Sequence, residues 1–142
     1  MKTFAIRNGD LVVGKSGYVT VGGTAKLRQD LSHLVREPYG VDRFHVLWGS
    51  LLPTYVGSVI DQFSSSSVSS EVYRLLNNYA AVQRDQLTAE AVNGRRPQFS
   101  SGEVIADIVS VDVRQTMDRL YVRASVRTLS GEQVETIASL EV

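Results

Sequence analysis

The sequence reads Leu120-Tyr121-Val122-Arg123-Ala124-Ser125-Val126-Arg127 ahead of the turn signal Ser130-Gly131-Glu132. Apolar residues alternate with polar ones at a period of two, which is typical of a strand with one buried face. The segment after the turn alternates in the same way, with inward positions at Val134, Thr136, Ala138, Leu140 and Val142. Two strands joined by a hairpin are therefore predicted.

Matching the apolar faces of these two strands predicts their register. In an antiparallel pair, the match places Arg127 opposite Glu135, Ala124 opposite Ala138 and Val122 opposite Leu140. A third strand is predicted from Val104 to Val113, because apolar residues at both parities suit a strand covered on both faces. Residues 103–142 are thus expected to form a three-stranded antiparallel meander.

Three helices are predicted in residues 23–96. The first covers about residues 24–36, with an apolar face at helical spacing formed by Leu27, Leu31, Leu34 and Val35. A second, shorter helix follows Pro53 and ends at the serine run of residues 64–67, with a face formed by Val56, Val59, Ile60 and Phe63. The longest runs from about Ser70 to Val92 and ends at Asn93-Gly94, with a face formed by Val72, Leu75, Leu76, Tyr79, Val82 and Leu87.

Residues 1–22 are β-branched and aromatic and are cut by turn residues such as Asn8-Gly9-Asp10, which predicts a short N-terminal β arm or hairpin. The 142 residues suffice for one core. We therefore predict a single α+β domain over residues 1–142, with three main helices packed on the C-terminal meander.

Composition narrows the possible functions. Fifteen basic and fifteen acidic residues cancel, which argues against nucleic acid as a partner, and no apolar run is long enough for a membrane span. The chain has no cysteine, and His33 and His45 lack metal-ligand spacing, so we expect no metal and no cofactor. No nucleophile motif is present, and Asp30, Glu37 and Asp42 are interpreted as surface acids. We expect a chain that is not an enzyme.

Two features point to binding. Four aromatic residues cluster within seventeen positions, and they suit either a lid on the core or anchors at a protein interface: Tyr39, Phe44, Trp48 and Tyr55. The last predicted strand has no proline or lysine to block its edge. Its backbone groups are available to a strand from another chain, unless its own chain caps them.

A helix with Leu27, Leu31 and Leu34 precedes Gly40-x-Asp42-Arg43 and Trp48-Gly49-Ser50-x-Leu52, and a long helix and a strand meander follow. This order of elements, over roughly residues 20–140, resembles the baseplate wedge or sheath-initiator family of phage contractile tails, which has relatives in type VI secretion and contractile injection systems. Two departures stand out. Val46 lies where the family usually has proline, and only Glu103 matches the family's Glu-Pro-Arg at the start of the sheet.

The resemblance implies a structural subunit of the virion tail baseplate, assembled in the host cytoplasm and present in multiple copies around the tail axis. Its partners are then other baseplate wedge proteins, and tail tube or sheath subunits that join it by strand addition. The residues expected to bind protein are Tyr39, Gly40, Asp42, Arg43, Phe44, Trp48, Gly49, Glu103, Val134, Thr136, Ala138 and Leu140.

Two other interpretations stay open. Some relatives carry a lysozyme-like label, which would make the chain a cell-wall lytic tail enzyme that uses Glu37 or Asp42. The third is a small adaptor unrelated to tails, since one fold hosts many functions.

Overall fold

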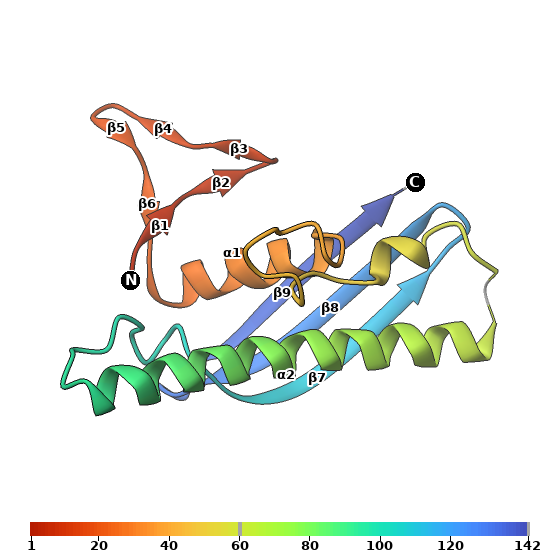
Figure 1. Ribbon diagram of the computed structural model, residues 1–142. Helices are drawn as coiled ribbons and strands as arrows, with labels where there is room; N and C mark the ends of the chain where they lie inside the picture. The colour runs from red at the N-terminus through yellow and green to blue at the C-terminus, as the bar shows by residue number, and fades with distance from the viewer. Residues whose placement is uncertain (60, 142) are drawn as a thin grey trace.

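The computed structural model describes residues 1–59 and 61–141 (Figure 1). Its last three strands, β7 (Ile105–Gln115), β8 (Arg119–Thr128) and β9 (Gln133–Glu141), form one antiparallel sheet in that order. Helix α1 (Gly23–Arg36) packs on β9, and helix α2 (Gln62–Val92) packs on β7. Both helices therefore cover the same face of the sheet.

The core lies between the two helices and the sheet. It is built mainly from aliphatic side chains, and the helical members are Leu27, Leu31, Leu34, Val35, Val68, Val72, Leu75, Leu76, Tyr79 and Ala80. The sheet contributes Ile105, Leu120, Val122, Ala124, Val126, Val134, Ala138 and Leu140. Each leucine-sized side chain contributes about 1.5–3 kcal/mol on burial, so this layer fixes both helices on the sheet.

The described residues form two α-helices, so the prediction of three main helices was wrong. Only a 3-10 turn, η1 (Leu52–Thr54), lies between them, and the serine run at residues 64–67 belongs to α2 instead of ending a helix. A capping box explains this start. The Asp61 carboxylate accepts from the Ser64 N–H at 2.6 Å, and the Ser64 hydroxyl oxygen accepts from the Asp61 N–H at 3.0 Å. Ile60, on which the extra helix was partly predicted, lies outside the described residues.

The β8–β9 hairpin differs from the predicted register by two residues. The observed partners are Leu120 and Leu140, Val122 and Ala138, Ala124 and Thr136, and Arg127 and Gln133. The turn has the expected length but lies one residue earlier, at residues 129–131, because the Thr128 N–H donates to the Glu132 carbonyl and the Gly131 N–H donates to the Thr128 carbonyl, both at 2.9 Å. Gly131 has φ +87°, as a three-residue hairpin loop requires. A register shift of two residues leaves every side chain on the same face of the sheet, so the residues predicted to point inward are buried. Val142, which was also predicted to point inward, lies outside the described residues.

Strand β7 does not have two covered faces as predicted. Its pairing with β8 shifts register twice, between Ile105 and Asp107 and between Ile108 and Ser110. After each shift, the side chains that face the core change between odd-numbered and even-numbered positions. The apolar residues that point inward are therefore Ile105, Ile108, Val111 and Val113. Val109, which supported the prediction of two covered faces, is 41% exposed.

The N-terminal arm, residues 1–22, contains three separate two-stranded antiparallel sheets. The pairs are β1 (Thr3–Phe4) with β6 (Thr20–Val21), β2 (Ile6–Arg7) with β3 (Asp10–Leu11), and β4 (Val13–Gly14) with β5 (Gly17–Tyr18). They meet where the N–H groups of Ala5, Val19 and Val12 donate in a ring to the carbonyls of Val19, Val12 and Ala5 at 2.7–2.9 Å. Figure 1 shows the arm as a triangle on the far side of α1 from the sheet.

Candidate protein interface

Strand β9 is an edge of the sheet that is regular along its whole length. It pairs with β8 at nine consecutive positions without a register shift. Because the hairpin bond joins Thr128 and Glu132, antiparallel alternation points the backbone groups of even-numbered β9 residues at β8. The groups that point to the open edge belong to Gln133, Glu135, Ile137, Ser139 and Glu141.

The opposite edge, on β7, is a poorer template for another strand. Its two register shifts interrupt the row of backbone groups, which is a common protection of edge strands. Its start is also occupied by Gln83 of α2, which is 1% exposed. The Gln83 side-chain amide donates to the Glu103 carbonyl at 2.6 Å and accepts from the Ile105 N–H at 3.0 Å. Strand β9 is therefore the better site for strand addition.

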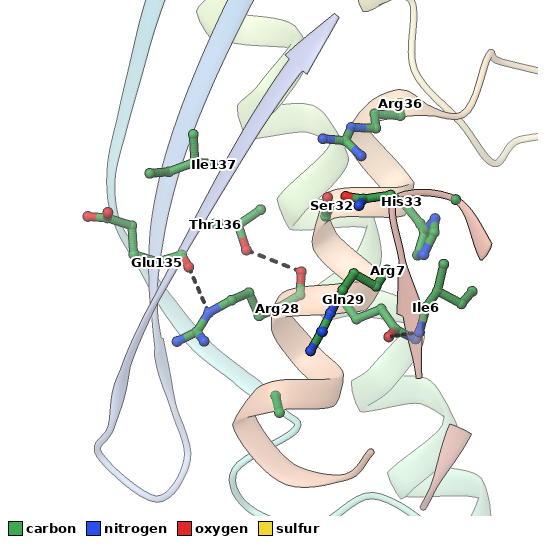
Figure 2. A pocket seen from close by; sticks show the side chains of 13 residues that line it. Ile6, Arg7, Arg28, Gln29, Ser32, His33, Arg36, Glu135, Thr136 and Ile137 are labelled. Carbon is green, nitrogen blue, oxygen red and sulfur yellow. Dashed lines mark hydrogen bonds between the residues drawn. The ribbon is translucent and has the colours of Figure 1, made fainter. Parts of the chain in front are cut away.

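A groove of about 840 Å³ runs along α1, with the β9 edge on one side and the arm on the other (Figure 2). Arg28 crosses it: its Nε donates to the Glu135 carbonyl oxygen at 3.1 Å, and the Thr136 hydroxyl donates to the Arg28 carbonyl at 3.4 Å. Within residues 1–59 and 61–141, the outward backbone groups of Ile137 and Ser139 have no hydrogen-bond partner. The edge is therefore capped at Glu135 and open beyond it.

Gln29 of α1 fixes the arm as the second wall of the groove. Its side-chain amide accepts from the Ile6 N–H and donates to the Phe4 carbonyl, both at 2.9 Å. Gln83 makes the same pair of bonds at the start of β7. Because of this clamp, the β2–β3 end of the arm faces β9 across α1.

The aromatic loop, residues 37–51, closes on itself at its base. Pro38 and Ser50 form a parallel bridge, and the Ser50 N–H donates to the Glu37 carbonyl at 2.7 Å. Gly49 lies inside this closure with φ +96°, and a Cβ on it would lie 2.4 Å from the Pro38 carbonyl oxygen. Only glycine fits there, which accounts for the second glycine of the loop motif.

Helix α2 holds the base of the loop through Glu71 and Arg74. The Glu71 carboxylate accepts from the Leu51 N–H at 2.9 Å and from the Arg74 guanidinium at 2.6 and 2.7 Å. Arg74 also donates to the Gly49 carbonyl at 3.2 Å and lies over the Tyr39 ring at 5.6 Å. Burial raises the pKa of Glu71, but the hydrogen bonds from Arg74 and Leu51 outweigh it and leave this pKa lowered. The loop is thus anchored by an ionised carboxylate.

Asp42 shapes the tip of the loop. Its carboxylate lies 2.9 Å from His45 Nδ1 and accepts from the N–H groups of Phe44 at 2.8 Å and His45 at 3.3 Å. These hydrogen bonds, with the His45 side chain first, lower the pKa of Asp42. Gly40 turns the chain with φ +76°, and Arg43 is exposed beside Asp42. The predicted glycine, acid and arginine therefore lie together, with the acid in a local turn-forming role.

The aromatic cluster divides between core and surface. Trp48 is half-buried, and its ring lies 5.7 Å from that of Tyr79, so it belongs to the lid on the core. Phe44 is 92% exposed and lines a hollow of about 470 Å³ between the loop and α2. The interpretation as a lid on the core therefore applies to Trp48, and the role of Phe44 as an interface anchor stays a prediction.

Three apolar residues that line this hollow were missed as site residues from the sequence: Val46, Leu47 and Val82. Val82 was assigned to the buried face of α2 but is 48% exposed, and Leu47 is 73% exposed. The available signal was the run Phe44-His45-Val46-Leu47, which places three apolar residues in four positions of a loop. Clustered apolar exposure of this kind is typical of protein contact sites.

Glu103 lies away from the loop and is 2% exposed. Its carboxylate accepts from the Gly23 N–H at 2.9 Å and from the Ser100 N–H at 3.1 Å, so it caps the first turn of α1. The loop leaves the other end of this 14-residue helix, about 20 Å away. The contact of Glu103 with a partner stays a prediction, and the structure places its side chain inside the chain.

The four predicted residues of β9 also point inward. The side chains of Val134, Thr136, Ala138 and Leu140 are buried in the core face, and their backbone groups point to β8. The open edge is therefore formed by their odd-numbered neighbours. The predicted residues do not form one site, and two separate candidate surfaces result: the loop tip and the β9 groove.

No protein-family model matches the chain, and no curated protein sequence matches it. One solved structure is similar, a crystal structure of a Geobacter sulfurreducens protein that is described provisionally as a tail lysozyme. The match covers 94% of this chain and 96% of that chain, with a TM-score of 0.54 and 14% sequence identity. The chain therefore shares the fold of that protein.

Two of the acidic residues considered from the sequence, Asp30 and Asp42, make structural contacts through their carboxylates. The Asp30 carboxylate pairs with Lys26 and accepts from the Tyr79 hydroxyl at 2.9 Å, and burial and this carboxylate raise the pKa of Tyr79.

In the described part of the chain, no three His, Cys, Asp or Glu side chains gather as metal ligands. Neither α1 nor α2, as described, is long and apolar enough to cross a membrane.

Proposed function

We propose that this chain is a structural subunit of a phage tail baseplate, a wedge component or sheath initiator. It docks through the tip of its aromatic loop and presents the edge of β9 to a neighbouring tail protein, in several copies around the tail axis. The β9 edge is the observation that carries the proposal, because it is regular, unbulged and open beyond Glu135. The fold shared with a protein described as a tail lysozyme supports the assignment to a tail.

Strand addition at β9 has a sufficient energetic basis. The outward N–H and C=O groups of Ile137 and Ser139 and the Glu135 N–H offer about five hydrogen bonds, and each contributes about 1 kcal/mol net. The Glu135 carbonyl is already bonded to Arg28. A neighbour that pairs with these residues therefore gains several kcal/mol from the backbone alone. Several copies of the chain around the tail axis present several such edges, so avidity adds to the affinity of each single contact.

The loop tip supports a second contact, which we assign to a baseplate wedge protein. Phe44 and Leu47 offer exposed apolar surface beside a hollow, and aromatic anchors in such places carry much of the affinity of protein interfaces. The base of the loop is already held by Glu71 and Arg74, so binding orders few additional groups. A rigid base with an apolar tip suits a permanent docking contact.

The name of the Geobacter protein favours a second candidate function, a cell-wall lytic enzyme that uses Glu37 or Asp42. Glycoside hydrolysis needs one carboxyl group with a raised pKa as the general acid. The pKa of Asp42 is lowered, and both of its oxygens are engaged by the loop. These observations argue against Asp42 as the general acid. Release of peptidoglycan fragments by the purified chain, lost in Glu37→Gln or Asp42→Asn, would favour the enzyme instead.

The strand-addition proposal needs a variant that blocks the edge and leaves the core intact. Deleting residues 133–142 is unsuitable, because β9 supplies buried residues to the core. Ile137→Pro removes one outward N–H, and its position on an edge strand tolerates proline without loss of the β8 ladder. Ile137→Val is the matched control.

Each variant is used to complement a deletion of the gene in the phage that encodes it, and tails are examined by negative-stain electron microscopy. Ile137→Pro is expected to yield baseplates without attached tail bodies, whereas Ile137→Val yields complete tails. Complete tails assembled with folded Ile137→Pro protein would contradict the proposal. Circular dichroism of the purified variants establishes the folded state in both cases.

A further inference from the structure

The groove beside β9 has a positive charge although the chain is neutral overall. Arg28 and Arg36 line it from α1, and Arg7 lines it from the arm. Glu135 is the one acidic residue of the lining among the described residues, and its carboxylate lies 3.7 Å from Arg123 Nε. Figure 2 shows Arg28 and Arg36 reaching from α1 toward β9.

Arg28 also occupies the position that an added strand needs. Its Nε donates to the outward Glu135 carbonyl at 3.1 Å, which is where a backbone N–H of a neighbouring strand would donate. The arginine therefore acts as a cap on the open edge. An incoming strand has to displace this guanidinium and offer it another partner.

We propose that the occupant of the β9 groove is an extended segment of another polypeptide with Asp or Glu at alternate positions, and that it displaces Arg28 from the strand edge. This inference rests on the proposed strand addition and specifies the chemistry of the partner. Every second side chain of an added strand points to the helix side, where it meets Arg28 and Arg36. Carboxylates at those positions match guanidinium groups in charge and geometry.

Two labelled peptides of the length of β9, about nine residues, test the proposal. One alternates threonine and glutamate, the other threonine and lysine, and fluorescence anisotropy reports their binding to the full chain. Hydrogen exchange of the Ile137 and Ser139 amides reports the site. The glutamate peptide is expected to bind at least about tenfold more tightly at low ionic strength, to weaken with added salt, and to protect both amides.

Variants at Arg28 separate the effect of its charge from the effect of its hydrogen bond. Arg28→Gln removes the charge and keeps a hydrogen-bond donor, so it should reduce the preference for the glutamate peptide severalfold. Arg96→Gln is the control, because Arg96 is exposed and lies outside the groove lining. Equal binding of the two peptides, no binding of either at millimolar concentration, or protection of amides away from β9 would overturn the proposal.

A failure of the acidic-partner proposal is distinguishable from a failure of the proposed tail function. If Ile137→Pro blocks tail assembly but the peptides bind equally, strand addition stands and the acidic partner is wrong. If Ile137→Pro leaves assembly unchanged while the glutamate peptide still protects Ile137, the groove binds acidic strands but the tail function is wrong.

Discussion

Gly49 and Pro38 approach so closely that a Cβ on Gly49 would lie 2.4 Å from the Pro38 carbonyl oxygen. Gly49→Ala therefore forces the loop base apart, and its φ of +96° adds strain, so we expect the free energy of unfolding to fall by about 2–4 kcal/mol. Gly94→Ala is the control, with φ +65° but open space around it, and should lose only about 1 kcal/mol. Equal losses by urea unfolding would show that the close approach is unimportant.

Gln83 joins α2 to the start of β7 with both ends of its amide. In Gln83→Leu, the buried Glu103 carbonyl and Ile105 N–H lose their partners, at about 1–3 kcal/mol each. Denaturant unfolding should therefore show a loss of about 2–6 kcal/mol. Gln86→Leu, at a half-buried position on the same helix, should lose less than about 1 kcal/mol. A Gln83→Leu protein as stable as the parent chain would refute this role.

Glu71 should make the stability of the fold sensitive to acid. Its folded pKa lies below the ordinary value of 4.5, so its contribution is complete above that pH and is lost as the pH falls through the folded pKa. Arg74 is partly exposed, so solvent limits the effect to about 1 kcal/mol. Urea midpoints at about pH 7, 5 and 3 should fall less steeply in Glu71→Gln than in the exposed control Glu132→Gln. Parallel pH profiles for the two variants would argue against the anchor.

Gln29 ties the arm to α1, so Gln29→Ala should release the arm while the core stays folded. The Ile6 amide is expected to exchange about tenfold faster, with a shift in Tm below about 2 °C. Gln29→Glu keeps the acceptor for Ile6 and loses the donor to Phe4, so its exchange rate should be intermediate. The clamp is excluded if the Ile6 amide exchanges at the same rate in all three proteins.

Period-two alternation was enough to predict β8, β9 and their inward residues, because that pattern directly reflects one-sided burial. It did not determine the register, because a shift of two residues leaves every side chain on its own face. The turn decides the register through Gly131 and the bond between Thr128 and Glu132. In β7, two bulges changed the parity and made a one-sided strand look two-sided in the sequence.

The number of helices was mispredicted where capping and composition disagree. A serine run suggests a linker, yet Asp61 caps a helix that continues through it. Val68, which follows the run directly, is fully buried and supports the first turns of α2 from the core. Local residue type was therefore overridden by a cap on one side of the run and a core contact on the other.

The candidate surfaces were only partly predictable. Glycines and aromatics marked the loop, but the inward position of Trp48 depends on Tyr79 in a distant helix. The β9 groove needs the arm, α1 and β9 together, and its key contact joins Arg28 to a residue 107 positions away. No local pattern in the sequence reports such a pair.

In the assembled tail, the β9 edge is expected to be filled by a neighbouring polypeptide. Hydrogen exchange of the Ile137 and Ser139 amides, compared between the free chain and purified tails, tests it most directly. We expect rapid exchange in the free chain and at least about a hundredfold slower exchange in the tail. Rapid exchange of both amides in the tail, with protection confined to the aromatic loop, would contradict it.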